Sequence, residues 1–170
     1  AKKKLCLSCR TCRMPELPEV ETVRRGLADL LPGQAVVRAT VFDSPKSFPN
    51  SPTDVQQFLY GAHVTAVRRR AKVLMIDLDT RYSLVIHLKM TGQLIFRGAN
   101  SFAGGHPNDS LIGELPDRST RVQIDFTDGS HLFFNDQRKF GWMKLMPTDE
   151  IENLPFMQKV GPEPLDKKTE

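Results

Sequence analysis

The sequence lacks any long apolar run, and this absence argues against a membrane-spanning helix. Its apolar runs, such as residues 84–86, are far shorter than the roughly 20 residues that cross a bilayer. Residues 1–13 contain no continuous apolar stretch of the kind that a secretory signal requires. We therefore expect a cytoplasmic protein, and 170 residues of ordinary composition suffice for one domain with a substantial core.

Cysteine is absent after position 12. Cys6, Cys9 and Cys12 follow one another at Cys-x-x-Cys-x-x-Cys spacing in the leading segment. Thiolates two residues apart can share a metal ion, but a structural zinc site takes four ligands, and no histidine lies nearby to complete the set. We interpret residues 1–13 as a basic, disordered extension, with a metal-binding knuckle as the alternative.

The body of the chain also lacks an excess of positive charge. Five of the 24 lysine and arginine residues lie in residues 1–13, which leaves 19 basic against 20 acidic residues. An overall electrostatic attraction to nucleic acid is therefore excluded for the body, and any such contact depends on local clusters. The clearest clusters are residues 68–72, which read Arg-Arg-Arg-Ala-Lys, and Arg138-Lys139.

Apolar spacing predicts two helices and a set of short strands. Residues 16–31 repeat apolar side chains every three or four positions and stop at Pro32-Gly33, which predicts a helix. Residues 51–60 predict a second helix, because Ser51 can cap it and Pro52 suits its first position. Runs rich in β-branched residues predict strands over residues 35–42, 63–70, 73–79, 83–89, 122–126, 131–134 and 142–146.

The connections complete the predicted architecture. Residues 127–130, Thr-Asp-Gly-Ser, predict a hairpin turn, and the polar, glycine-containing residues 97–119 predict a long loop. Many short strands with two helices indicate an α+β fold, in which an antiparallel β-sandwich is flanked by two helices. Prolines exclude a helix or central strand in residues 160–165, so we expect residues 148–170 to be a linker.

The segment Met14-Pro15-Glu16-Leu17-Pro18-Glu19-Val20-Glu21-Thr22 resembles the start of bacterial formamidopyrimidine-DNA glycosylases. The resemblance continues, in the same order, through Arg69-Arg70-Ala71-Lys72, His87-Leu88-Lys89-Met90-Thr91-Gly92-Gln93-Leu94, Asn135-Asp136-Gln137-Arg138-Lys139-Phe140-Gly141 and Gly161-Pro162-Glu163-Pro164-Leu165. It implies that residues 14–147 are the catalytic N-terminal domain of a base-excision repair enzyme. That family excises oxidised purines, such as 8-oxoguanine and formamidopyrimidines, and then cuts the strand at the abasic site.

The resemblance implies three catalytic residues. Pro15 would be the nucleophile, because a free N-terminal proline offers a secondary amine that forms an iminium at the sugar C1′. Glu16 matches the neighbouring acid/base residue, and Lys72 matches a lysine that contacts DNA near the lesion. The alternatives are that Pro15 and Glu16 only suit a helix start and that Lys72 belongs to a solvated charge run. The preceding residues 68–70 include such solvated arginines, so only Lys72 of this cluster is assigned a DNA contact.

The resemblance also implies four DNA-binding residues. Met90, Arg138 and Phe140 match side chains that fill the gap left when the damaged nucleotide leaves the duplex. The alternative is that Met90 and Phe140 are core residues, but nearby glycines indicate exposed turns. Many relatives carry Lys-His where this chain has Arg118-Ser119, so a phosphate contact is assigned to Arg121. We interpret His87 as a buried, hydrogen-bonded histidine without a catalytic role.

The resemblance implies a monomer that binds double-stranded DNA containing oxidised purines or abasic sites, associated with the bacterial nucleoid. No cofactor is expected within this chain, because the family's helix-two-turn-helix domain and four-cysteine zinc finger would lie beyond Glu170. Thirteen residues precede Met14, so the Pro15 nitrogen of the chain as given is an ordinary amide. A non-catalytic module that binds damaged DNA and an inactive truncated fragment are therefore the alternatives.

Overall fold

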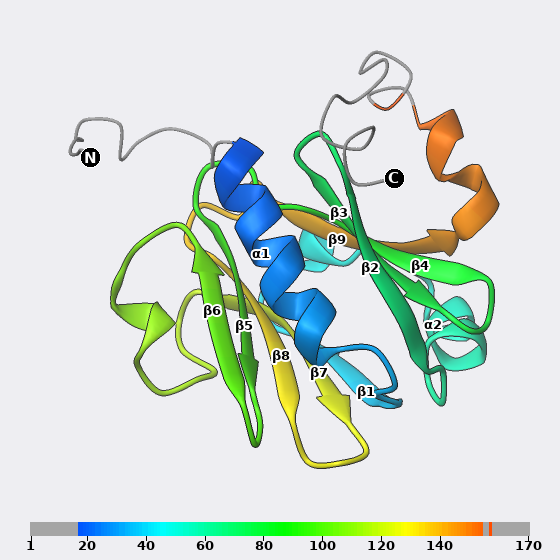
Figure 1. Cartoon of the computed structure of the whole chain (residues 1–170), viewed down its shortest axis with the longest axis horizontal. Helices are drawn as coiled ribbons and strands as arrows, with labels where there is room; N and C mark the ends of the chain where they lie inside the picture. Colours follow the sequence, from blue (N-terminus) through cyan, green and yellow to red (C-terminus); the bar gives the residue numbers. More distant parts are fainter. Residues whose placement is uncertain (1–16, 155–156, 158–170) are drawn as a thin grey trace.

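The computed structural model describes residues 17–154 and Met157, and these residues form two antiparallel sheets with a helix between them (Figure 1). The five-stranded sheet has the order β1 (Val36–Val41), β7 (Thr120–Phe126), β8 (His131–Asp136), β5 (Gly92–Arg97) and β6 (Ser101–Gly105). The four-stranded sheet has the order β2 (Val64–Arg70), β3 (Val73–Leu78), β4 (Tyr82–His87) and β9 (Trp142–Pro147). The predicted α+β class and antiparallel sandwich are confirmed.

Helix α1 (Leu17–Leu30) closes one open side of the sandwich (Figure 1). It packs against β2 and β6, which are the outer strands of the two sheets. The predicted apolar face is buried and consists of Val20, Val23, Leu27 and, just after the helix, Leu31. Burial of each such side chain contributes roughly 1.5–3 kcal/mol, which fixes the helix on the two sheet edges. No helix in the described part of the chain is long and apolar enough to span a bilayer.

The second predicted helix is also present, as α2 (Pro52–Phe58). The Ser51 hydroxyl accepts a hydrogen bond from the Asp54 backbone N–H at 3.2 Å, as the cap prediction required. Just before this cap, the Asn50 side chain pairs with the edge of β9. Its Nδ2 donates to the Leu145 carbonyl at 2.6 Å, and its Oδ1 accepts from the Leu145 N–H at 2.8 Å. This segment thereby covers the free edge of the four-stranded sheet.

The apolar residues form two clusters. The larger core lies between the sheets and under α1, and it includes Phe134, Leu94 and Ile86, which are fully buried. The smaller cluster consists of Val73, Met75, Val85, Met146, Ile151 and Met157. Residues 148–153, the start of the predicted linker, form the 3-10 helix η4 (Thr148–Asn153), which contributes Ile151 to this cluster. An ion pair between Arg70 and Glu152 also joins β2 to η4.

The prediction of a loop over residues 97–119 is wrong in two places. Residues 101–105 form β6, which pairs with the unpredicted strand β5, and a short 3-10 helix, η3 (Asp109–Leu111), follows. Gly104, one of the glycines that suggested a loop, instead makes room for α1. A Cβ atom on Gly104 would lie 2.7 Å from Val23 Cγ2, and a Cβ on Gly26 of α1 would overlap the Phe102 ring. Small residues therefore allow close helix–strand packing here.

Alanine normally stabilises a helix by about 1 kcal/mol relative to glycine. At position 26, however, this contact predicts that alanine is destabilising. Gly26→Ala is expected to lower the free energy of unfolding by roughly 1–3 kcal/mol, because the added methyl overpacks the Phe102 site. Urea denaturation measures this change. The Gly26→Ala/Phe102→Ala double variant should be more stable than Phe102→Ala alone, and an increase in stability for Gly26→Ala itself would contradict the account.

Candidate functional site

Four of the predicted site residues lie on turns at one end of the sandwich. Lys72 lies between β2 and β3, Met90 between β4 and β5, and Arg138 and Phe140 between β8 and β9. Figure 1 shows these three turns along the upper edge of the molecule, where α1 also begins. Pro15 and Glu16 lie outside the described residues, and so do Cys6, Cys9 and Cys12. The described start of α1, Leu17, follows directly after the predicted catalytic pair.

The Asp136 carboxylate links two of these turns. It is fully buried and accepts hydrogen bonds from the Thr91 hydroxyl, the Arg138 N–H at 3.2 Å and the Gly141 N–H at 2.5 Å. The Arg138 N–H also lies 3.3 Å from the Thr91 hydroxyl oxygen. A buried carboxylate is stable only when such donors replace its water. Asp136 therefore fixes the β4–β5 turn and the β8–β9 turn to each other.

In each of these two turns the chain passes from one sheet to the other. The first leads from β4 in the four-stranded sheet to β5 in the five-stranded sheet, and the second returns from β8 to β9. Glycine is required at both. A Cβ on Gly92 would overlap the Leu88 carbonyl oxygen, and a Cβ on Gly141 would lie 2.8 Å from the His87 carbonyl oxygen. The crossings are therefore tight, and Asp136 lies between them.

The side chains predicted to enter DNA are not part of either apolar cluster. Phe140 is 57% exposed, Arg138 is exposed and Met90 is half-buried. Lys139 has a left-handed backbone conformation, with φ of 61°, and its Nζ donates to the Asp43 carbonyl at 3.2 Å. An exposed phenylalanine beside an arginine on a turn held by a buried carboxylate is suited to insertion into a partner.

Lys72 lies on a turn that is held by a residue the sequence analysis did not single out. Arg69 belongs to the basic cluster of residues 68–72, and it is only 5% exposed. Its Nε donates to Glu21 Oε1 of α1 at 2.8 Å, and its Nη1 donates to the Ala71 carbonyl at 3.0 Å. The alternation of side chains along β2 could have predicted this burial, because it places Arg69 on the same face as buried Val67.

His87 is hydrogen-bonded, as the sequence predicted, but half-buried where the prediction was a buried residue, and it also lies close to two lysines. Its Nδ1 accepts from the Lys89 N–H at 3.1 Å, and its ring centroid lies 6.0 Å from that of Trp142. Burial lowers the pKa of His87 to about 4, with further contributions from the charges of Lys89 and Lys72. The imidazole is therefore neutral at neutral pH, and because Nδ1 is an acceptor, its proton is on Nε2.

Arg121 is mostly buried and lines a groove. Its Nε donates to the Asp136 carbonyl at 2.8 Å, and the residue is 6% exposed. The groove has a volume of about 550 Å³ and is lined by Ser110, Asp117, Arg118, Ser119, Arg121 and Gln137. The Asp117 carboxylate accepts from the Ser110 hydroxyl at 2.5 Å and from the Ser119 N–H at 2.8 Å. Two arginines and several donors therefore border this groove, which is suited to an anion.

The Asp136 arrangement yields a stability prediction. Asp136→Ala is expected to lower the free energy of unfolding by on the order of 3 kcal/mol, because it leaves donors from two turns without their charged acceptor. Urea denaturation measures the loss, and NMR shifts of the Arg138 and Gly141 amides report the local change. Asp128→Ala is the control, since Asp128 accepts similar hydrogen bonds from Ser130 but is exposed. Equal effects of the two variants would contradict the account.

The depressed pKa of His87 predicts a pH dependence. The unfolded chain binds a proton at His87 as pH falls through 6.5, whereas the folded chain does so only near 4. The stability due to the neutral ring is therefore complete above pH 6.5 and is lost as pH falls from 6.5 to 4. The free energy of unfolding of His87→Gln, measured by denaturation over this range, should therefore fall less steeply with decreasing pH than that of the parent protein. An NMR titration that places the His87 pKa near 6.5 would contradict the prediction.

Comparisons with known proteins agree with the geometry. The profile of the family described as "Formamidopyrimidine-DNA glycosylase N-terminal domain" matches residues 14–143. The formamidopyrimidine-DNA glycosylase of Dinoroseobacter shibae is 39% identical over 147 residues, which cover 86% of this chain and 50% of that protein. The one of Jannaschia sp. is 42% identical over 149 residues, with the same coverages. The chain spans about half the length of the curated relatives it matches.

Solved structures give the same result. A Lactococcus lactis formamidopyrimidine-DNA glycosylase, non-covalently bound to DNA containing an AP site, matches with a TM-score of 0.71 and 28% identity, over 88% of this chain and 52% of that chain. The Lactococcus lactis enzyme with DNA containing N7-benzyl-Fapy-dG matches with the same TM-score and identity, over 88% of this chain and 50% of that chain. The chain therefore belongs to the formamidopyrimidine-DNA glycosylase family, and the part that matches is its N-terminal domain.

Proposed function

We propose that this chain is the catalytic N-terminal part of a base-excision repair enzyme, a bifunctional DNA glycosylase and abasic-site lyase. Its substrate would be double-stranded DNA of the bacterial nucleoid that contains oxidised purines or abasic sites. The observation that carries the proposal is the convergence of the turns bearing Lys72, Met90 and Arg138 at the end of the sandwich where α1 begins. Family membership and the DNA-bound state of the Lactococcus lactis structures support it.

The proposed chemistry begins at Pro15, provided that its nitrogen is a free amine. The amine attacks C1′ of the damaged nucleotide, the C1′–N bond to the base breaks, and the base leaves with a proton. Ring opening then gives an iminium between Pro15 and C1′, which makes the neighbouring C2′–H bond acidic enough for elimination of the 3′-phosphate. Glu16 would move the sugar protons. An amine close to the positive end of the α1 dipole would be disfavoured as an ammonium and would therefore stay reactive.

Reaching C1′ requires that the damaged nucleotide leave the duplex. Unstacking takes a few kcal/mol, which side chains that fill the vacated space offset. Met90, Arg138 and Phe140 would supply this filling from the two turns that Asp136 joins. Arg121 would contribute a phosphate contact from the groove that it shares with Arg118. Lys72 would contact the DNA near the lesion, and such contacts make binding salt-dependent.

Borohydride trapping on abasic-site DNA tests the proposal. A chain prepared with Pro15 as its first residue is expected to form a covalent adduct that peptide mapping locates at the Pro15 nitrogen. The chain beginning at Ala1 is the matched control, because there the same nitrogen is an amide and cannot form an iminium. The amount of adduct at Pro15 should fall by at least about ten-fold in this control.

A second experiment tests whether DNA binding needs more protein than this chain. Residues 15–165 are joined to the second half of the Jannaschia sp. relative and tested in the same way. Absence of an adduct from both the Pro15-initiated chain and this fusion would contradict the lyase assignment. Salt-dependent binding to damaged DNA without trapping would instead support a non-catalytic DNA-binding module.

A further inference from the structure

A buried ion pair connects the first turns of α1 to the turn that carries Lys72. Glu21 lies on α1 and is 7% exposed, and Arg69 lies near the end of β2 and is 5% exposed. Arg69 Nε donates to Glu21 Oε1 at 2.8 Å. These residues are 48 positions apart in the chain, so their contact fixes one element against the other.

The same guanidinium also holds the turn itself. Arg69 Nη1 donates to the Ala71 carbonyl at 3.0 Å. Ala71 has a φ of 52°, in the left-handed region that a residue with a Cβ adopts only when its surroundings hold it there. Lys72 follows directly. The planar guanidinium of Arg69 therefore binds the Glu21 carboxylate of α1 and the β2–β3 turn at the same time. The single ammonium of a lysine cannot do this with the same geometry.

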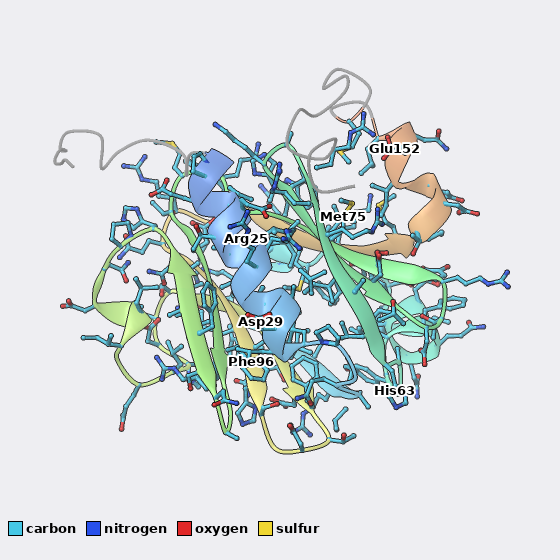
Figure 2. All side chains as sticks on the ribbon, in the orientation of Figure 1. Arg25, Asp29, His63, Met75, Phe96 and Glu152 are labelled. Carbon is cyan, nitrogen blue, oxygen red and sulfur yellow. The ribbon has the colours of Figure 1, made fainter. Side chains whose placement is uncertain are left out.

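Two further arginines keep the Glu21 carboxylate in place. Arg24 donates to both of its oxygens, through Nε at 3.0 Å and Nη2 at 2.8 Å, and Arg25 Nε donates to Oε2 at 2.9 Å. Arg25 lies on the surface of α1 (Figure 2). The hydrogen bonds from Arg24, followed by those from Arg69 and Arg25, lower the pKa of Glu21 to about 2, although burial opposes this shift. Glu21 is therefore charged at any physiological pH.

Arg24 adds a second connection between α1 and β2. Its Nη1 lies 3.4 Å from the Val67 carbonyl of β2, two residues before Arg69. The first turns of α1 are thus bound to the last residues of β2 through side chains, in addition to the apolar packing of the helix. Leu17, where the described helix begins, is one turn before Glu21 and two residues after Pro15.

We propose that the Glu21–Arg69 pair is a positioning device, which sets the Lys72 turn relative to the start of α1. This inference rests on the proposed function, because it concerns the distance between the amine at Pro15 and the DNA contact at Lys72. Neither Glu21 nor Arg69 touches the DNA in this account. Their role is to hold the two groups that do.

Arg69→Lys tests the proposal, because it keeps the charge but removes the fork. Arg68→Lys is the matched control on the neighbouring residue, since Arg68 pairs with Asp77 on the exposed face of β2. Both are made in the Pro15-initiated protein and assayed by single-turnover trapping at saturating abasic-site DNA. A displacement of about 1 Å can slow an oriented reaction by about 100-fold, so we expect Arg69→Lys to be slower by about ten-fold or more. Arg68→Lys should match the parent protein.

A double variant separates positioning from general stability. If Arg69 acts through Lys72, then Arg69→Lys/Lys72→Ala should be no slower than Lys72→Ala alone. Additive losses in the double variant would overturn the proposal, as would a parental trapping rate for Arg69→Lys at a temperature where urea denaturation shows it to be folded.

An NMR readout decides the proposal independently of activity. Arg69→Lys should shift the Ala71 and Lys72 amide resonances and speed their hydrogen exchange, whereas Arg68→Lys should leave them unchanged. Unchanged turn amides in Arg69→Lys would overturn the positioning role even if no variant forms an adduct. Failure of the parent protein to trap DNA, with the expected amide changes present, would count against the proposed function alone and would support the structural connection.

Discussion

The buried carboxylate of Asp136 is the constraint on which the arrangement of this end of the molecule depends. A charged group without solvent is stable only when protein donors surround it, and here the donors come from the β4–β5 turn and the β8–β9 turn, each of which joins one sheet to the other. The Asp136 carbonyl also accepts from Arg121 at 2.8 Å, which extends the connection to β7. One residue thus fixes the relative positions of Met90, Arg138 and Arg121, which come from distant parts of the sequence.

A second buried carboxylate, that of Glu21, joins two other elements of the candidate site. Glu21 accepts from arginines of α1 and β2, so the start of the helix and the Lys72 turn are fixed together. The β8–β9 turn is exposed, whereas Lys72 and Met90 on the other two turns are half-buried, and all three turns connect strands packed on a continuous apolar core. Chemistry carried by loops requires a rigid scaffold, and in this domain charged hydrogen bonds connect the scaffold to the loops.

Much of the fold could be predicted from the sequence, because periodicity and capping are local signals. The spacing of Val20, Val23 and Leu27 predicted the buried face of α1, and Ser51 predicted the cap of α2. Strand β6 could not be predicted, because Gly104 is typical of a loop until the packing of Val23 against it is known. The buried states of Arg69 and Asp136 depend equally on partners far along the chain. The motifs suggested the residues of the candidate site, and tertiary contacts show how the turns that carry Lys72, Met90, Arg138 and Phe140 are held.

The most direct test of this account is a crystal structure of the borohydride-reduced complex between the Pro15-initiated protein and abasic-site DNA. We expect a bond between the Pro15 nitrogen and C1′, with the Met90, Arg138 and Phe140 side chains in the space left by the displaced nucleotide. We also expect the hydrogen bonds of Asp136 and Glu21 to persist in the complex. DNA bound to another face of the sandwich, with the three turns in solvent, would contradict this account.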